Sequence, residues 1–166
     1  MRILIAFAGK TGTTDEMCRL LASLLPCHEV TVADLTKSTP VPGDFDHVVL
    51  GGAVRMGKLH RALRSYLKEN GEALAALPHT LFLLCAYADQ FENYAEMLYP
   101  AALLESADEL LYFGGELNVS RQRSLIDKML VRMMRNAILE SEDDEAALPG
   151  LLPEHVRLLA DRLCGR

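Results

Sequence analysis

A short, continuously apolar run near the start of the chain, Ile3 to Phe7, breaks at residues 8–14 into a hydroxyl-rich turn and then into a helical pattern. A run this short, with no polar alternation, is typical of a strand buried on both faces of a parallel sheet. Two acids, Asp15 and Glu16, follow the turn, where the dipole of a helix favours negative charge. The sequence therefore predicts a central strand, a tight turn and a helix.

The turn has the composition of an anion-binding loop. A helix N-terminus presents unpaired backbone N–H groups and a partial positive charge, so a Gly/Thr loop leading into it can hold a phosphate. Glycines allow a close backbone approach, threonines add hydroxyl donors, and a lysine can neutralise phosphate charge. The alternative is a tight connection whose threonines only cap the helix, and the loop alone leaves both open. The expected phosphate loop is Gly9, Lys10, Thr11, Gly12, Thr13 and Thr14.

Two commoner phosphate loops do not fit this turn. A Walker A loop has a glycine five residues before its Gly-Lys pair, and Leu4 stands at that position. A dinucleotide fingerprint needs G-x-G-x-x-G, whereas only Gly9 and Gly12 are present. Asp34 stands where a ribose ligand would lie, but an aspartate that leaves a strand is usually part of a turn.

Strand patterns alternate with helical patterns along the rest of the chain. This alternation predicts right-handed crossovers and a parallel sheet covered on both faces. The second strand alternates polar and apolar residues, which suits a sheet edge and the strand order 2-1-3-4-5. We expect an α/β three-layer sandwich with further strands at 29–35, 47–50, 80–85 and 109–113, and helices that include 91–105, 121–139 and a last one that carries Val156, Leu159, Ala160 and Leu163.

Composition limits the function classes. A chain of 166 residues that is half apolar fits one domain, residues 1–166. Its 23 acids and 17 bases give a net charge of −6, which argues against nucleic acid as a partner. No run is long and apolar enough to span a bilayer, and the first strand leaves no room for a signal peptide. We therefore expect a cytoplasmic protein.

The cysteines are scattered along the chain without C-x-x-C spacing. We interpret Cys18, Cys27, Cys85 and Cys164 as reduced structural thiols and expect no metal site. No residue triad indicates a hydrolase, and the sequence predicts no particular catalytic residue.

In a sheet of this order, ligands bind beyond the carboxyl ends of the strands, between the first and the third. Three loops rich in small residues meet there: the phosphate loop, the loop that follows the third strand and the loop that follows the fourth. The expected binding residues outside the phosphate loop are Ala53, Val54, Arg55, Met56, Gly57, Ala86, Tyr87, Ala88 and Asp89.

The sequence from Thr11 to Thr14 resembles the T-G-x-T end of the phosphate loop of flavodoxins, whose usual ligand is FMN. Within that group, the segment from Gly51 through Arg55 to His60 is similar to the G-x-x-x-R-[aromatic]-G-x-x-H segment of the menaquinone-dependent protoporphyrinogen dehydrogenases. The resemblance implies a flavodoxin-like fold, FMN as cofactor, and a quinone or a redox partner protein as electron acceptor.

Two positions depart from these patterns, and three others have two interpretations each. Gly9 stands where flavodoxins usually carry Ser or Thr, and Met56 replaces the aromatic residue, although its thioether can cover a flavin face. Tyr87 is expected to stack on the ring, or else to be a partly buried core tyrosine. Arg55 faces the flavin or an acidic substrate, or else is an ordinary surface arginine, and His60 is interpreted as a solvated or capping residue rather than a proton donor.

A basic amphipathic helix is expected at about residues 120–139, added to the flavodoxin pattern. One interpretation packs the apolar stripe of Arg121 to Leu139 on the sheet and leaves a solvated basic face. The other makes this helix a peripheral membrane or partner contact at the inner face of the membrane, near the quinone. A third has its arginines attract the propionates of a porphyrin.

We therefore expect an FMN-dependent oxidoreductase, specifically one that oxidises protoporphyrinogen with a quinone as acceptor. The first alternative is an electron-carrier flavodoxin without its own substrate. The second is a binding module that keeps the fold and has lost FMN. The sequence carries no signal for the oligomeric state.

Overall fold

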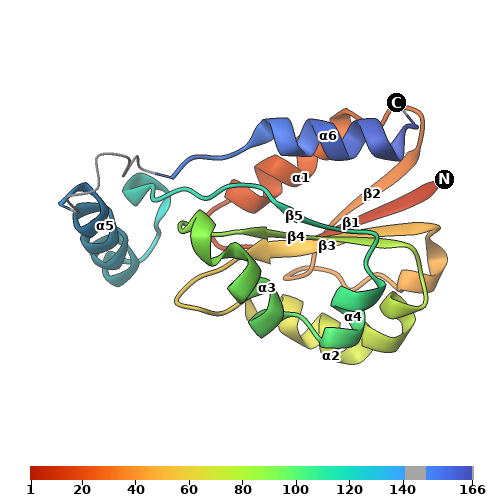
Figure 1. The fold of residues 1–166 in the computed structure, drawn as a ribbon, viewed down its shortest axis with the longest axis horizontal. Helices are drawn as coiled ribbons and strands as arrows, with labels where there is room; N and C mark the ends of the chain where they lie inside the picture. Colours follow the sequence, from red (N-terminus) through yellow and green to blue (C-terminus); the bar gives the residue numbers. More distant parts are fainter. Residues whose placement is uncertain (141–148, 166) are drawn as a thin grey trace.

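The strand that follows Met1 lies inside a five-stranded parallel sheet with the order β2-β1-β3-β4-β5 (Figure 1). The computed structural model describes residues 1–140 and 149–165. Parallel pairing joins every neighbouring pair of strands, with Ile5 opposite Val32 on one side and Val49 on the other. The strand order and the parallel sheet are as predicted, and the strands are β1 (Arg2–Ala8), β2 (Glu29–Asp34), β3 (His47–Ala53), β4 (His79–Leu84) and β5 (Glu109–Tyr112).

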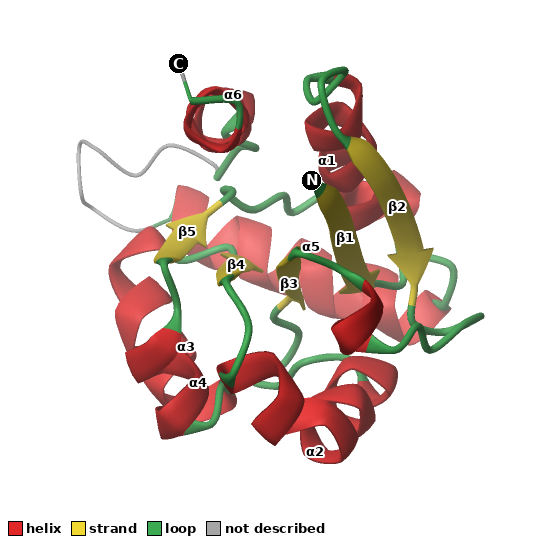
Figure 2. Cartoon of the chain, turned by 90° about the vertical axis from the view of Figure 1, so that its right-hand side faces the viewer, coloured by secondary structure: helices red, strands yellow, loops and turns green. Residues whose placement is uncertain are grey.

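Side chains of β1 alternate between two apolar layers. Ile3, Ile5 and Phe7 point to the layer under α1 (Thr13–Ser23) and α6 (Pro153–Leu163). Leu4, Ala6 and Ala8 point to the layer under the helices of the opposite face. These opposite helices are α2 (Arg61–Ala75), α3 (Phe91–Leu98) and α4 (Ala101–Ser106), seen below the sheet in Figures 1 and 2. Both faces are therefore covered, as the apolar pattern of β1 predicts.

The single helix predicted at 91–105 is wrong, because the chain forms α3 and α4 with a break at Tyr99 and Pro100. Proline disfavours a helical residue before it and cannot donate its own backbone hydrogen bond, so the first helix ends there. Tyr99 is extended and buried, and its hydroxyl donates to the Phe82 carbonyl at 2.8 Å. The turn chemistry expected at Asp34 is present, since its carboxylate accepts from the backbone N–H of Thr36 at 3.0 Å.

The helix predicted at 121–139 exists as α5 (Leu125–Leu139), preceded by a short 3₁₀ turn at Val119–Arg121. Of the three interpretations of this helix, the one that packs its apolar stripe on the sheet is wrong. Val131 is its one buried residue, and α5 stands beyond the carboxyl ends of the strands (Figure 1). Of the acidic segment that follows, residues 141–148 lie outside the described residues. No described helix has the length and apolarity needed to cross a membrane.

Candidate functional site

The phosphate loop connects β1 to α1 through a left-handed Gly12. Its φ is 83°, a conformation that favours glycine, and it places the following N–H groups at the start of α1. No side chain caps this helix, so the interpretation of the threonines as helix caps is wrong. The hydroxyls of Thr11 and Thr13 lie 3.2 Å apart instead. The loop therefore offers backbone and hydroxyl donors together at a helix N-terminus.

Gly9 is explained by packing against Thr14. A Cβ at Gly9 would lie 3.1 Å from Thr14 Oγ1, tighter than ordinary van der Waals contact. Thr14 is 2% exposed, so its hydroxyl is turned into the protein. A serine or threonine side chain at this position would crowd Thr14, whereas glycine leaves room for it.

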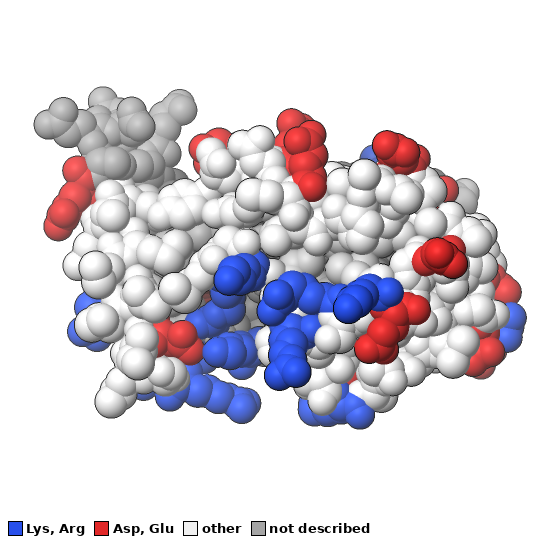
Figure 3. Space-filling model, turned by 90° about the horizontal axis from the view of Figure 1, so that it is seen from below, with Lys and Arg blue, Asp and Glu red and all other residues white. Residues whose placement is uncertain are grey.

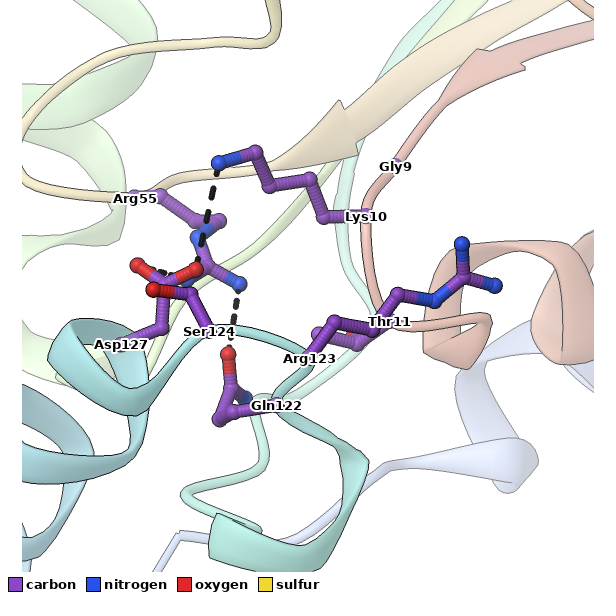
Figure 4. Close-up of a pocket in the computed structure, with 8 residues that line it drawn as sticks. All are labelled: Gly9, Lys10, Thr11, Arg55, Gln122, Arg123, Ser124 and Asp127. Atoms are coloured by element: carbon purple, nitrogen blue, oxygen red, sulfur yellow. Dashed lines mark hydrogen bonds and ion pairs between the residues drawn. The ribbon is translucent and has the colours of Figure 1, made fainter.

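Four of the predicted residues line a cavity of about 330 Å³, which is at the small end for a ligand site. Gly9, Lys10 and Thr11 line it from the phosphate loop and Arg55 from the end of β3 (Figure 4). The opposite wall comes from the segment at the start of α5 and consists of Gln122, Arg123, Ser124 and Asp127.

Asp127 is the acid at the centre of this cavity. Its carboxylate lies 3.1 Å from Arg55 Nη2 and 3.9 Å from Lys10 Nζ (Figure 4). Arg55 Nη1 also donates to Gln122 Oε1 at 2.9 Å. The start of α5 thus supplies partners to Lys10 in the phosphate loop and to Arg55 at the end of β3. An incoming anion would meet Lys10 and Arg55 only in competition with Asp127.

A second set of contacts holds the segment before α5 against α1. Arg121 donates to Glu16 Oε2 at 2.9 Å, and its Nε lies 3.5 Å from Glu116 Oε2. The Thr13 hydroxyl donates to the same Glu116 carboxylate at 3.4 Å. Residues 116–127 therefore lie over the phosphate loop and close one side of the cavity.

The loop after β3 forms a tight two-residue turn. Arg55 and Lys58 exchange backbone hydrogen bonds of 2.9 and 3.0 Å around Met56 and Gly57. Both central residues have positive φ, 50° and 70°, as a type I′ turn requires. Such a φ is uncommon for a residue with a side chain, and Met56 is 81% exposed. Ala53 and Val54 lead into the turn, which holds the Met56 side chain outward.

Among the described residues, none from the loop after β4 lines this cavity. Tyr87 is half-buried, and its carbonyl accepts from the backbone N–H of Gln90 at 3.1 Å. Ala88 and Asp89 are exposed, and Ala86 is half-buried. The neighbouring Cys85 is buried, which raises the pKa of its thiol to about 11, so it stays protonated near neutral pH.

One further expectation, on His60, can be compared with the contacts. His60 is a helix cap, as interpreted, since its Nδ1 accepts from the Ala62 backbone N–H at 3.2 Å. Sequence reasoning missed the wall from the start of α5. The sequence feature that could have indicated this wall is the capping pattern from Ser124 to Asp127, in which a serine precedes an acid by three residues. Ser124 is indeed the N-cap, accepting from the Ile126 N–H at 3.2 Å.

The donors around the loop fit a phosphate ester. They comprise the uncapped N-terminus of α1 and the side chains of Lys10 and Arg55. Beside them lie the hydroxyls of Thr11 and Thr13, which hydrogen-bond to each other and, from Thr13, to Glu116. A family model described as a flavodoxin domain matches residues 4–145. The chain belongs to the flavodoxin family.

Individual relatives are more distant. Protoporphyrinogen IX dehydrogenase (quinone) of Escherichia coli K12 is 29% identical over 85 residues, which are 49% of this chain and 47% of that protein. The match thus spans about half the length of this curated relative. A flavodoxin of Streptococcus pneumonia TIGR4 is 16% identical with a TM-score of 0.54 over 99% of both chains. A short-chain flavodoxin associated with a bacterial microcompartment has 10% identity and a TM-score of 0.51, covering 84% of this chain and 97% of its own. The two structures show the shared fold.

Proposed function

We propose that this flavodoxin-family chain binds FMN and oxidises protoporphyrinogen, with a quinone as the electron acceptor. The observation that carries the FMN proposal is the uncapped N-terminus of α1, with Gly12 left-handed and threonine hydroxyls beside it. Bound FMN would supply the redox chemistry, while the protein supplies binding, access and electrostatics.

Each part of the site would have its own role. The N–H groups of α1 with Thr11 and Thr13 would hold the phosphate. Met56 and Tyr87, from the loops after β3 and β4, are the residues available to contact the ring faces. Lys10, Arg55 and Arg123 line the cavity with positive charge, and Figure 3 shows Lys and Arg side chains gathered around the hollow on this face. Such a field would favour a substrate that carries carboxylates.

Support for the porphyrinogen is the segment from Gly51 to His60 together with the partial similarity to the E. coli dehydrogenase. An electron carrier without its own substrate is the alternative, supported by the net charge of −6 and by the flavodoxins of matching fold. These functions share the FMN site and differ in whether substrate is oxidised.

The first test mixes the purified protein with FMN or with riboflavin, removes unbound flavin and records the visible spectrum. Retention of FMN and not of riboflavin is expected, because the proposed contacts are to the phosphate. Thr11→Ala should weaken retention, and Thr36→Ala, in a loop outside the cavity, should leave it unchanged. A chain that retains no FMN would contradict both redox functions and favour the binding module.

The second test follows the oxidation of protoporphyrinogen by the FMN-loaded protein with a menaquinone analogue. Turnover that depends on both FMN and quinone is expected. Retained FMN without turnover would instead select the electron carrier.

We also propose that α5 binds the surface of an anionic membrane, where a quinone is dissolved. Five large apolar side chains of this helix are more than half exposed: Leu125, Ile126, Met129, Met133 and Leu139. Lys128 and Arg132 flank Met129 and Met133 along the same hollow. An exposed apolar face beside basic residues is the pattern of an interfacial helix.

Sedimentation with lipid vesicles tests this contact. Binding to phosphatidylglycerol vesicles is expected to exceed binding to phosphatidylcholine vesicles and to weaken in high salt. Met129→Glu with Met133→Glu should abolish it. The matched control is Met97→Glu on α3, since Met97 is 67% exposed on another face. Equal binding by the double variant would rule out this surface.

A further inference from the structure

Two cysteines that are 137 residues apart in the sequence lie together at the far side of the molecule from α5. Cys27 Sγ and Cys164 Sγ are 2.8 Å apart. Cys27 lies between α1 and β2, and Cys164 is the C-cap of α6. In Figure 1 the carboxyl end of α6 and the amino end of β1 share one side, opposite α5. The scattered spacing of the cysteines along the chain did not indicate that this pair would meet.

His28 completes a group of three possible metal ligands. Its ligand atom, Cys27 Sγ and Cys164 Sγ all lie within 4.8 Å of one another. Among the described residues, this is the one group of three or more His, Cys, Asp or Glu side chains whose possible ligand atoms lie this close together. The histidine is half-buried, and Cys27 is exposed, so an ion has a path from solvent.

The ring of His28 is oriented in the way that metal-binding histidines are. Its Nε2 lies 2.9 Å from the Leu163 carbonyl, which can only accept, so Nε2 carries the proton. Nδ1 is then an acceptor with a lone pair. This atom is buried, and no described group hydrogen-bonds to it. A buried acceptor without a partner is costly, whereas a metal bound there would satisfy it.

We propose that Cys27, His28 and Cys164 bind one thiophilic divalent ion, such as Zn²⁺, with water as the fourth ligand. On binding, the two thiols release two protons to solvent and bind as thiolates, while neutral His28 binds through Nδ1. Zn–S bonds of about 2.3 Å at tetrahedral angles place the sulfurs roughly 3.8 Å apart, so the thiols separate by about 1 Å.

A disulfide is the competing explanation for two close sulfurs. The 2.8 Å between the sulfurs lies between an S–S bond of about 2.05 Å and the roughly 3.8 Å of a tetrahedral zinc site, so either arrangement requires the sulfurs to move. The two differ at His28, because a disulfide would leave its Nδ1 without a partner, since the bridged sulfurs carry no proton to donate. The metal accounts for all three side chains, and the disulfide accounts for two.

The consequence of the site is structural. The ion would join the end of α6 to the chain that enters β2, and α6 otherwise packs on α1 and on the apolar layer that contains Val156 and Leu159. A site that binds the folded chain alone raises its melting temperature with metal concentration. At a hundredfold excess over Kd, the expected rise is roughly 5–10 °C.

The test uses the reduced full chain without a histidine tag, titrated with Co²⁺ and then with Zn²⁺. One Co²⁺ per chain is expected, with thiolate-to-cobalt charge-transfer absorption that Zn²⁺ abolishes, and release of two protons. Cys27→Ser, Cys164→Ser and His28→Ala should each weaken binding by more than the roughly 10–100-fold that loss of an outer-shell partner costs. Cys18→Ala and His155→Gln are the matched controls.

Three outcomes would overturn the proposal. The first is no uptake of Co²⁺ at micromolar concentration by the reduced protein. The second is uptake that survives Cys27→Ser or Cys164→Ser, or that does not depend on His28. The third is a Cys27–Cys164 disulfide found by mass spectrometry in protein that takes up no metal after reduction. None of these outcomes depends on flavin binding.

Discussion

Helices α2 and α5 are each 15 residues long and amphipathic, and each has a side-chain N-cap, yet they have opposite surroundings. In α2 the apolar face is buried against the sheet, through Leu63, Tyr66, Leu67 and Leu74. In α5 the apolar face is exposed, and Val131 alone is buried. Amphipathic periodicity therefore identifies a helix without identifying what covers it.

The difference between the two helices follows from the topology. α2 is the crossover between β3 and β4, so it must return along the sheet and cover it. α5 follows β5, the last strand, and no later strand requires it to lie on the sheet. Ion pairs of Asp127 with Arg55 and Lys10 hold its start beside the strand ends. This leaves its apolar face available for a partner.

Truncating one apolar residue in each helix should give the largest contrast. Leu63→Ala leaves a cavity in a layer where Leu63 is 0% exposed, so it should lower the free energy of unfolding by about 2–5 kcal/mol. Met133→Ala on α5, where Met133 is 60% exposed, should change it by less than about 0.5 kcal/mol. Urea unfolding measures both, and equal losses would mean that α5 is covered.

Removing the two N-caps should separate global from local stability. His60→Ala and Ser124→Ala each delete an acceptor for a helix N–H and should cost about 1 kcal/mol. For α2 the loss should appear in global unfolding, because α2 unfolds with the core. For α5 it should appear only as faster hydrogen exchange of its own amides. Faster exchange in α2 after Ser124→Ala would show that the helices open together.

The core was predictable because its signals are local. The apolar run of β1 indicated burial on both faces, and the polar alternation before Asp34 indicated an edge strand. The break at Pro100 was missed because the apolar periodicity continues across it, although the proline itself was visible.

The candidate site was predictable only in the half that comes from the strand ends. Lys10 was expected in the phosphate loop and Arg55 beside it, whereas Gln122 and Asp127 reach the cavity from a segment more than a hundred residues after that loop. The meeting of Cys27 with Cys164 has the same origin. Contacts between distant segments depend on the packed fold, and residue spacing does not encode them.

Removing the Asp127 carboxylate tests whether the start of α5 competes with an anion for Arg55 and Lys10. Asp127→Asn removes the carboxylate 3.1 Å from Arg55 Nη2, so FMN should bind about fivefold more tightly, as loss of a repulsion of about 1 kcal/mol implies. Stability should fall by about 0.2–1 kcal/mol, as for other partly exposed ion pairs. Equilibrium titration followed by flavin fluorescence measures the affinity, and Asp44→Asn, an exposed aspartate in the turn Pro42–Asp44 outside the cavity, is the control. Unchanged or weaker FMN binding would mean that Asp127 does not compete.

Mild acid should destabilise the sheet and the helices packed on it, and should leave the stability of α5 unchanged. His47 at the start of β3 is buried, and burial lowers its pKa from about 6.5, with His79 adding to the fall and Asp108 and Glu109 opposing it. The unfolded chain therefore binds this proton more readily, so the stability that neutral His47 contributes is present above pH 6.5 and is lost as the pH falls below it.

The measurement is the free energy of unfolding in urea at pH 7 and at pH 5.5, for the wild type and for His47→Gln. The variant keeps an amide near Thr80, whose hydroxyl lies 3.1 Å from His47 Nε2, and should show a shallower loss between the two pH values. Helix α5 contains no histidine, so its exchange rates, corrected for intrinsic pH dependence, should not change. If the variant loses as much unfolding free energy between pH 7 and pH 5.5 as the wild type, groups other than His47 cause the acid sensitivity. The difference between α5 and the rest of the protein would then be one of packing alone.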